Sequence, residues 1–264
     1  MFKLDKLSKE GTVAILRRLS TAEARFKELN KVVFNTRTLT KRLKELQMEG
    51  LIRKVEARYT ITNEGFDIIF KISELEEKAK LKWIYDGELS KIRFRWMKIS
   101  LRRLVEAFLK EFDDELISII LYGSATRDTF QQGRSDIDLL YILEDDTTDI
   151  WQREENIFKN FQSTWEYKAC DHLLKTQGFY GYPEVTTLSL HKSHAKIFQP
   201  IYLDMLPHRA VLYDKQEFFH KLKKKLQEAL KTLGTIRIEH ADGTYCWFLK
   251  PNMTPGESIE INLR

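Results

Sequence analysis

The sequence predicts an α+β fold in two parts, a small N-terminal domain of helices and short strands and a larger domain with helices around a mixed sheet. Two observations indicate this division. Apolar residues recur at helical spacing through residues 10–47, whereas the apolar runs 116–122 and 136–143 have the composition of buried strands. The chain of 264 residues also exceeds the usual size of one domain, so we expect two.

The N-terminal part is expected to form a winged helix-turn-helix. Its predicted helices span residues 10–19, 21–30 and 36–47, its predicted strands span residues 51–54 and 57–61, and a further helix begins at residues 62–65. Asn35 is a suitable N-cap for the third helix, because its side chain can accept a hydrogen bond from the first turn. Gly50 can end the same helix, since glycine readily adopts the left-handed conformation.

This segment resembles winged-helix regulators of the MarR/HxlR type over about residues 8–72. The resemblance is carried by Phe26–Leu29, Thr36–Leu46, Gly50–Ile52 and Tyr59–Gly65. It implies that the third helix can enter the major groove of DNA. We therefore expect contacts to DNA or RNA from Thr36, Arg37, Thr38, Lys41 and Arg42 on the helix and from Arg53, Lys54 and Arg58 on the wing.

The charge distribution agrees with an anionic partner but does not require one. Residues 1–110 contain 26 Lys and Arg against 15 Asp and Glu, and residues 111–264 contain 18 against 24. A local basic excess suggests nucleic acid. The alternative is a winged helix used for protein contacts or dimerisation, with ordinary surface charge. A homodimer would suit paired half-sites on DNA.

A basic helical segment, residues 74–110, is expected to link the two domains, which then cover residues 1–73 and 111–264. Basic residues are interleaved there with aromatic and aliphatic ones; the basic ones are Lys91, Arg93, Arg95, Lys98, Arg102 and Arg103. An amphipathic helix packed on one or both domains explains this pattern, with Lys and Arg stems covering apolar surface. A second nucleic-acid contact is the alternative.

The larger domain follows a mixed order of strands and helices. Besides the strands 116–122 and 136–143, the pattern predicts a helix over 150–176, a strand over 184–190, helices over 192–206 and 215–232, and a closing pair of strands at 235–239 and 244–249. Gly234 ends the last helix, and residues 241–243 form the turn of the closing pair. The expected buried side chains of the first helix are Ile150, Trp151, Ile157, Phe158, Phe161 and Trp165.

A short motif joins the first two strands of this domain. The run Gly123-Ser124 follows the first strand, and the run Ser135–Asp138 opens the second. Strand side chains alternate between faces, so Asp136 and Asp138 point to the same side. Paired carboxylates suit Mg²⁺ or Mn²⁺, and a glycine turn lets backbone N–H groups approach phosphate closely. The motif therefore predicts a site for a metal-bound triphosphate.

The motif resembles the signature of the polymerase-beta-like nucleotidyltransferase superfamily, in which Gly-Ser is followed after a gap by Asp-x-Asp. The resemblance implies catalytic and metal-binding roles for Asp136 and Asp138, and nucleotide binding by Gly123, Ser124 and Ser135. Small members carry a further glycine near the place of Asp128, whereas here Gly133 comes later. With its winged helix the chain also resembles archaeal winged-helix nucleotidyltransferases, to which Trp247–Pro251 adds a weaker similarity.

The resemblance further implies a third carboxylate from a later strand, and the sequence leaves its identity open. Glu184 opens the third predicted strand and is the first candidate for this catalytic role. Two residues on, Thr186 cannot act as an anionic ligand. Asp204 is the second candidate, although its segment has a helical pattern. If neither Glu184 nor Asp204 reaches the metal, the protein would transfer the nucleotidyl group slowly or would only bind nucleotide.

Three functions are compatible with these features. The first is a metal-dependent nucleotidyltransferase that moves AMP from ATP to an unidentified acceptor and binds nucleic acid through its winged helix. The second is a DNA-binding transcription regulator whose degenerate nucleotidyltransferase domain senses nucleotide or mediates dimerisation. The third is a nucleotidyltransferase antitoxin acting on a partner toxin, for which a winged helix is unusual.

The cysteines, the histidines and the absence of a long apolar run in the sequence argue against several classes of protein. Cys170 and Cys246 stand in unrelated contexts, which argues against a disulfide framework and a structural zinc site. His191 and His194 are close in sequence but do not form a metal-ligand pattern. The N-terminus is charged, and no apolar run is long enough to span a bilayer. We therefore expect a cytoplasmic protein without a membrane partner.

Overall fold

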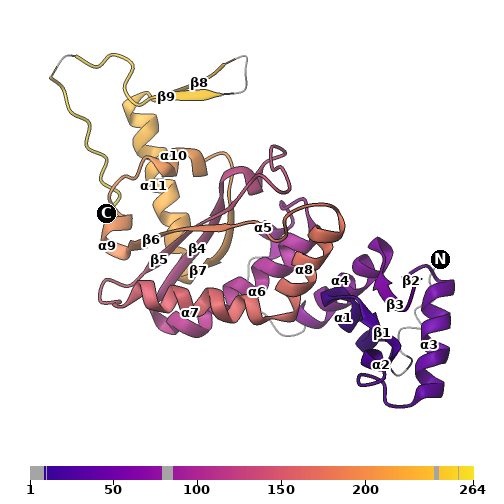
Figure 1. Ribbon diagram of the computed structural model, residues 1–264. Coiled ribbons are helices and arrows are strands. Elements are labelled where there is room, and N and C mark those ends of the chain that lie inside the picture. The colour runs from indigo at the N-terminus through magenta and orange to yellow at the C-terminus, as the bar shows by residue number, and fades with distance from the viewer. Residues whose placement is uncertain (1–8, 10, 79–85, 241–243, 255) are drawn as a thin grey trace.

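The computed structural model describes residues 9, 11–78, 86–240, 244–254 and 256–264. The N-terminal helices lie at one end of the molecule, and a four-stranded sheet with helices on both faces forms the larger part (Figure 1). This α+β architecture confirms the predicted fold class. Residue 10, where the first helix is predicted to begin, and the predicted turn at residues 241–243 lie outside the described residues.

The N-terminal part is a winged helix. Its elements are α1 (Thr12–Thr21), β1 (Ala24–Arg25), α2 (Phe26–Leu29), α3 (Thr36–Met48), β2 (Ile52–Val55), β3 (Arg58–Ile61) and α4 (Asn63–Lys78). The strands pair antiparallel in the order β1-β3-β2. Asn35 caps α3 as predicted, because its Oδ1 accepts a hydrogen bond from Thr38 N (3.0 Å). Gly50 follows α3 with φ +72°, also as predicted.

The predicted helix over residues 21–30 is wrong. α1 continues to Thr21, the next residue is extended, and Ala24 and Arg25 pair with Tyr59 and Arg58 of β3. Beyond Thr21, only the single turn α2 is helical in this stretch. The Ala24 side chain is buried. Pairing with β3 and burial of this side chain therefore outweigh the helix that the local spacing of apolar residues predicts.

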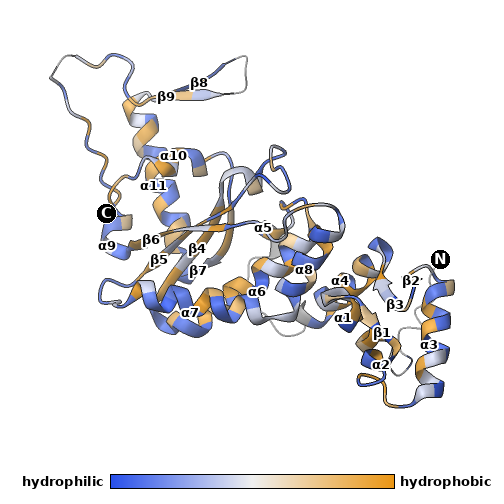
Figure 2. Ribbon diagram, viewed as in Figure 1, coloured by the Kyte–Doolittle hydropathy of each residue, from blue (hydrophilic) through white to orange (hydrophobic). Residues whose placement is uncertain are grey.

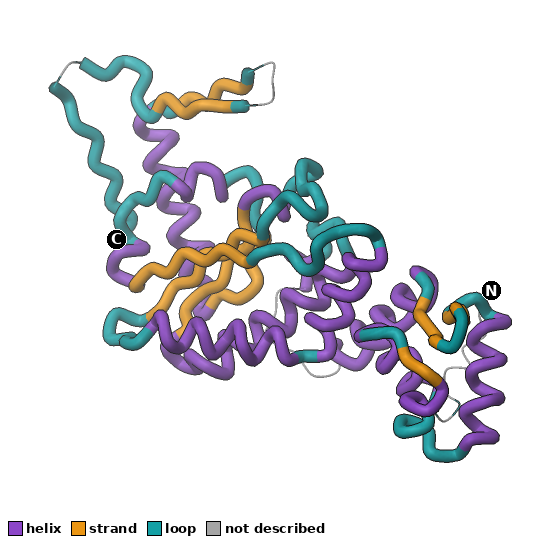
Figure 3. Tube along the Cα trace, viewed as in Figure 1, coloured by secondary structure: helices purple, strands orange, loops and turns teal. Residues whose placement is uncertain are grey.

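Four strands form the central sheet: β4 (Leu116–Tyr122), β5 (Ile137–Leu143), β6 (Val185–His191) and β7 (Ala210–Asp214). Their order is β6-β5-β4-β7. β5 and β6 are parallel and the other neighbours are antiparallel, so the sheet is mixed as predicted. β7 is not among the predicted strands, since its run is short and lacks a period-two pattern. The loops after β4 and before β5 and β6 gather at one end of the sheet (Figure 3).

Helices cover both faces of this sheet. One face is covered by α6 (Arg95–Phe112), α7 (Ile150–Ser163) and α8 (Trp165–Thr176), and the other by α11 (Phe218–Leu233) (Figure 1). Successive strand residues alternate between the two cores, with Ile119 and Leu139 on the α6 side and Ile120 and Leu140 on the α11 side. Hydrophobic residues accordingly concentrate on β4, β5 and the inner faces of the helices (Figure 2).

The predicted helix over residues 150–176 is divided in two. Thr164 is extended (ψ 154°), and its Oγ1 accepts a hydrogen bond from Tyr167 N (3.3 Å), so it caps the start of α8. Ile157 and Phe161 are buried as predicted, but Trp151 is 88% exposed, contrary to the prediction. A threonine that competes for backbone hydrogen bonds explains the break.

The basic segment 74–110 contains the end of α4, the short helix α5 (Asp86–Leu89) and most of α6. α6 is amphipathic and buries Trp96 and Phe108 in the core. Its basic residues make ion pairs, including Arg103 Nε with Glu166 Oε1 (2.7 Å) and Arg95 with Asp67. These contacts favour the interpretation of this segment as a packed amphipathic helix over its interpretation as a second nucleic-acid contact.

One continuous hydrophobic core joins the winged helix to the larger part. α1 packs against α8, and α4 packs against α6. Trp165 of α8 donates its Nε1 hydrogen to Arg17 O and Ser20 Oγ of α1, both at 3.1 Å. Its ring also contacts Phe70 of α4, with 6.4 Å between centroids. The winged helix is therefore held by buried side chains as well as by the chain connection.

The remaining elements are the short helices α9 (Lys192–Ala195) and α10 (Ile201–Met205) and the strands β8 (Ile236–Glu239) and β9 (Tyr245–Phe248). β8 and β9 pair antiparallel as a hairpin, which confirms the predicted closing pair of strands. In the described part of the chain, 3₁₀ turns cover Asp113–Glu115, Gly123–Thr126 and Lys215–Glu217. Ile261 and Leu263 of the tail return to the α11 side of the core. Within the described ranges, no helix has the length and apolar character needed to cross a membrane.

Candidate functional site

The first strand of the predicted site ends in a tight glycine turn. β4 runs to Tyr122, and the 3₁₀ turn Gly123–Thr126 follows it. Gly123 has φ +70°, which disfavours residues with a side chain. A Cβ atom on Gly123 would also overlap Oδ2 of Asp138. The glycine and the carboxylate therefore lie in direct contact.

The two predicted metal ligands lie at the start of the neighbouring strand. Asp138 is directly opposite Tyr122 in the antiparallel register, and Asp136 comes immediately before β5. Partial burial, and then the charge of Asp136, raise the pKa of the Asp138 carboxyl. The two carboxylates are thus close enough to repel each other. A divalent cation would relieve this repulsion, so the pair fits the proposed metal.

The loop between the glycine turn and β5 is fixed by aromatic residues. Phe130 is buried against Phe94 and Trp96, with centroid distances of 5.6 and 6.4 Å. Gly133 has φ +78°, and a Cβ there would come within 2.8 Å of the Phe179 ring. The contact with Phe179 accounts for a glycine at this later position of the loop.

The two predicted nucleotide-binding serines have different surroundings. Ser135 Oγ accepts a hydrogen bond from Gln131 N (3.0 Å), so this hydroxyl closes the loop. Ser124 lies in the glycine turn, and its carbonyl accepts from Arg127 N (2.9 Å). The Ser124 hydroxyl makes no hydrogen bond to another described residue and is partly exposed. Of the two, Ser124 is the better placed to bind a ligand.

Among the described residues, no third carboxylate forms a group with the aspartate pair. Thr186 is opposite Asp138 in the parallel register of β5 and β6, so the position beside the pair holds a hydroxyl. Glu184 is exposed just before β6, and its carbonyl accepts from Ile137 N (2.8 Å). Asp204 lies on α10 and accepts from the Tyr245 hydroxyl (2.6 Å). Among the residues that the structure describes, no three His, Cys, Asp or Glu side chains form a metal-binding group.

Sequence reasoning missed a cationic cluster beside the glycine turn. Arg127 comes directly after the turn and donates from Nη2 to the Tyr245 hydroxyl (3.2 Å). Arg237 lies over the same ring, with its Cζ 4.2 Å from the centroid. Arg127 could have been found from its place after Gly-Ser. Tyr245 and Arg237 belong to a hairpin far along the chain, and local sequence does not reveal where that hairpin packs.

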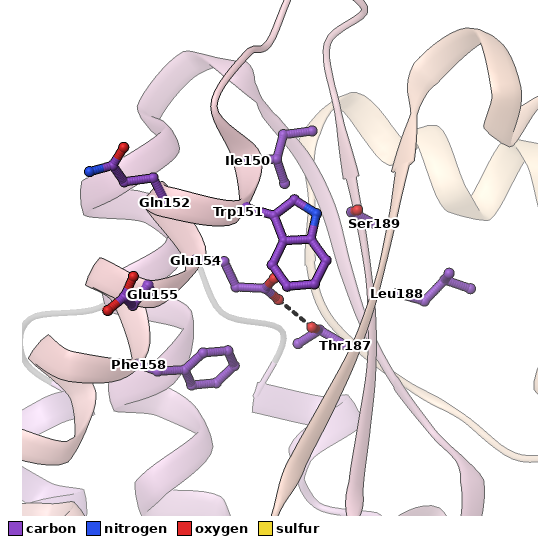
Figure 4. A pocket seen from close by; sticks show the side chains of 9 residues that line it. All are labelled: Ile150, Trp151, Gln152, Glu154, Glu155, Phe158, Thr187, Leu188 and Ser189. Atoms are coloured by element: carbon purple, nitrogen blue, oxygen red, sulfur yellow. Dashed lines mark hydrogen bonds between the residues drawn. The ribbon is translucent and has the colours of Figure 1, made fainter.

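A pocket lies elsewhere on the central sheet. A cavity of about 850 Å³ opens between α7 and the edge strand β6, where Glu154 hydrogen-bonds to Thr187 (Figure 4). Trp151 and Leu188 border the same cavity. Neither Asp136 nor Asp138 is among the residues that line this cavity, so it is separate from the aspartate pair.

The predicted nucleic-acid residues lie on α3 and on the β2–β3 wing. Exposed side chains there are Thr36, Arg37, Lys41, Arg53, Lys54 and Arg58. Thr38 is half-buried and its backbone is used in the helix cap. Arg42 differs from the rest, since its side chain is only 13% exposed and pairs with Glu45 (2.6 Å). The paired Arg42 is thus less available for a ligand than Arg37.

Comparison with known families gives two matches. A family model described as a nucleotidyltransferase domain matches residues 101–237, just over half of the chain. A family model described as an HxlR-like helix-turn-helix matches residues 7–85. Both matches confirm the resemblances stated from the motifs. A search of curated proteins and a search of solved structures found no match.

Proposed function

Since the chain belongs to the nucleotidyltransferase domain family, we propose that it is a metal-dependent nucleotidyltransferase that moves AMP from ATP to an acceptor hydroxyl. The observation that carries this proposal is the contact between the glycine turn and the aspartate pair. Because Gly123 has no side chain, the Asp138 carboxylate can lie against the end of β4. Besides partial burial, the charge of the nearby Asp136 raises the pKa of Asp138. A phosphate on the turn would therefore lie beside two carboxylates.

In this reaction the acceptor oxygen bonds to the α-phosphorus and releases its proton to water, while the bond between the α-phosphorus and the α–β bridging oxygen breaks to release pyrophosphate. Asp136 and Asp138 would hold Mg²⁺ or Mn²⁺ together with phosphate oxygens, since Mg²⁺ sites commonly use one or two protein carboxylates. The bound ion would neutralise charge that develops on the phosphate. The Ser124 hydroxyl and the N–H groups of the turn would orient the triphosphate.

The winged helix supplies the nucleic-acid part of the proposal. Arg37 and Lys41 on α3 and Arg58 on the wing are exposed on the part of the chain that matches a helix-turn-helix family. Guanidinium and ammonium groups in this arrangement suit phosphate contacts, and the arginines can also bind guanine edges. We propose that DNA or RNA bound here is either the acceptor or the signal that directs the enzyme to it.

One observation favours a second function, a DNA-binding regulator with a degenerate, nucleotide-sensing domain. Thr186 stands in register with Asp138 where a third carboxylate would complete a two-metal site. Glu184 comes directly before β6, and its side chain is exposed. A site with two carboxylates can bind nucleotide and metal without rapid turnover.

Calorimetry with ATP, GTP, CTP and UTP, with and without Mg²⁺ or Mn²⁺, tests the proposal on wild type and on the double variant Asp136→Asn/Asp138→Asn. Metal-dependent ATP binding that the double variant loses would support it. Pyrophosphate release in the presence of RNA, DNA or protein acceptors would support transfer itself. Binding without release from any acceptor would favour the regulator. No nucleotide binding by wild type would overturn both.

A further inference from the structure

Three distant segments meet beside the glycine turn. Arg127 follows the turn, Tyr245 belongs to β9, and Asp204 belongs to α10. The Tyr245 hydroxyl accepts from Arg127 Nη2 (3.2 Å) and donates to Asp204 Oδ1 (2.6 Å). Asp204, a candidate third carboxylate from sequence, is thus tied to the hairpin. This hydrogen-bond chain fixes β9 against the end of the central sheet.

A second guanidinium joins the group from the other strand of the hairpin. The Cζ of Arg237 lies 4.2 Å from the Tyr245 ring centroid and 5.9 Å from that of Trp247. The Cζ of Arg127 lies 5.8 Å from the Tyr245 centroid. Two guanidinium groups therefore share one aromatic ring, which orients both side chains.

The donors in this cluster exceed its acceptors. Arg127 Nε, Arg237 Nε and Trp247 Nε1 are shielded from solvent and donate to no acceptor within the described part of the chain. Arginine and tryptophan side chains cannot accept a hydrogen bond, so they cannot satisfy one another. Glu239 pairs with Arg237 (2.6 Å) but is two-thirds exposed. Burial, and then the charges of Arg127 and Arg237, lower the pKa of His208, so both guanidinium groups lie near this imidazole.

The cluster lies at the same end of the sheet as the aspartate pair. β7 begins at Ala210, which pairs with Leu121 near the end of β4, so the residues that precede β7 approach the end of β4 that carries the glycine turn. Asp138 pairs with Tyr122 on the other side of β4. A polyphosphate on the turn could therefore contact the aspartates at one end and the arginines at the other.

We infer that Arg127, Arg237 and Trp247 form an anion subsite that takes the terminal phosphates of the nucleotide, so that the β8–β9 hairpin is part of the substrate site. This inference rests on the proposed function. Guanidinium groups bind phosphate through two parallel hydrogen bonds, and a small movement of the side chains would give the unsatisfied donors an acceptor. The subsite would hold the pyrophosphate that leaves during transfer.

The test compares ATP, AMP and inorganic pyrophosphate by calorimetry, with Mn²⁺ present, on the full-length protein. The first variant is Arg237→Gln. Arg237→Lys keeps the positive charge but lacks the paired N–H donors of the guanidinium group. Trp247→Phe keeps an aromatic ring but lacks the indole N–H donor. Lys231→Gln on the exposed face of α11 is the control for the loss of one positive charge. Thermal unfolding of each variant verifies that the fold is retained.

We expect Arg237→Gln to weaken ATP and pyrophosphate binding by about tenfold or more, and to leave AMP binding unchanged. Arg237→Lys should recover part of the affinity, Trp247→Phe should lose about threefold, and Lys231→Gln should match wild type. Equal ATP binding by wild type and Arg237→Gln would overturn the subsite and leave the proposed function standing. Pyrophosphate binding that depends on Arg237, without any nucleotide binding, would support the subsite and overturn the proposed function.

Discussion

A methyl group on Gly123 would overlap Oδ2 of Asp138. The antiparallel register explains this contact. Tyr122 at the end of β4 lies opposite Asp138 on β5, so the following residue, Gly123, lies next to the Asp138 carboxylate. The two parts of the motif, separated by a loop in the sequence, therefore depend on each other in space. A side chain at residue 123 must displace the carboxylate that we assign to the metal.

The first prediction concerns this contact. Gly123→Ala should abolish or weaken by at least about tenfold the metal-dependent binding of ATP, because Asp138 must rotate away. Gly50→Ala is the matched control, since Gly50 has φ +72° against +70° at Gly123 but no atom near the position of a new Cβ. Both variants should lose about 1 kcal/mol of stability from backbone strain. Calorimetric titration checks this, and equal ATP affinity in the two variants would contradict it.

The second prediction concerns stability and pH. The raised pKa of Asp138 means that the folded protein holds this proton to higher pH than the unfolded chain. Stability is therefore lost as the pH rises from the ordinary carboxyl pKa through the raised one, and the loss persists at neutral pH. Asp138→Asn removes a partly buried charge and its repulsion with Asp136, so the metal-free variant should have a Tm about 1–3 °C above wild type at pH 7, since solvent screens part of the effect. The difference should shrink as the pH approaches the ordinary carboxyl pKa.

Addition of Mg²⁺ supplies the control for this effect. The ion should raise the Tm of wild type and leave that of Asp138→Asn unchanged, because only wild type gains a counter-charge for the pair. A lower Tm for the metal-free variant than for wild type would show that the carboxylate stabilises the fold, and would contradict the argument.

The third prediction concerns the contact between the two parts of the molecule. Trp165→Ala removes a ring that packs on Phe70 and two hydrogen bonds to α1, so it should cost about 2–4 kcal/mol. Because the core is continuous, wild type should unfold in one calorimetric transition, and the variant should show a separate, earlier transition of the winged helix. Trp151→Ala is the control, since that side chain is 88% exposed. Equal destabilisation by both substitutions would refute the role of Trp165.

The fourth prediction separates two arginines of α3. Arg37 is exposed, whereas Arg42 pairs with Glu45 (2.6 Å). Arg37→Ala should weaken binding to duplex DNA or RNA and lower the slope of log Kd against log salt by about 1. Arg42→Ala should change stability by up to about 1 kcal/mol with a smaller effect on binding. Titrations at several salt concentrations would decide, and unchanged binding by Arg37→Ala would count against a nucleic-acid role for α3.

The sequence was most informative where the structural signal is local. The β4 and β5 runs and the Asn35 cap depend on residues a few positions apart and lie as predicted, although β5 begins at Ile137, so that Asp136 precedes the strand. The failures have distant causes. Ala24 and Arg25 join a strand because β3 pairs with them, and Trp151 is exposed because α7 turns its other face to the core. The same limit applies to the site, since Tyr245 reaches Arg127 only through the folding of the hairpin.

The last prediction uses the register of β5 and β6. Thr186 is exposed and directly opposite Asp138, so a carboxylate there would face the pair across one strand spacing. Thr186→Asp should raise Mn²⁺ affinity in the presence of ATP by about tenfold and should raise any rate of pyrophosphate release. Thr186→Asn, of similar size but neutral, should do neither. Glu184→Gln measures what the present acidic residue contributes: if it lowers Mn²⁺ affinity, Glu184 reaches the metal on nucleotide binding and the gain from Thr186→Asp should be small. If Glu184→Gln has no effect and Thr186→Asp still fails to increase affinity, the edge strand does not face the metal and the assignment of the site to this end of β6 is wrong.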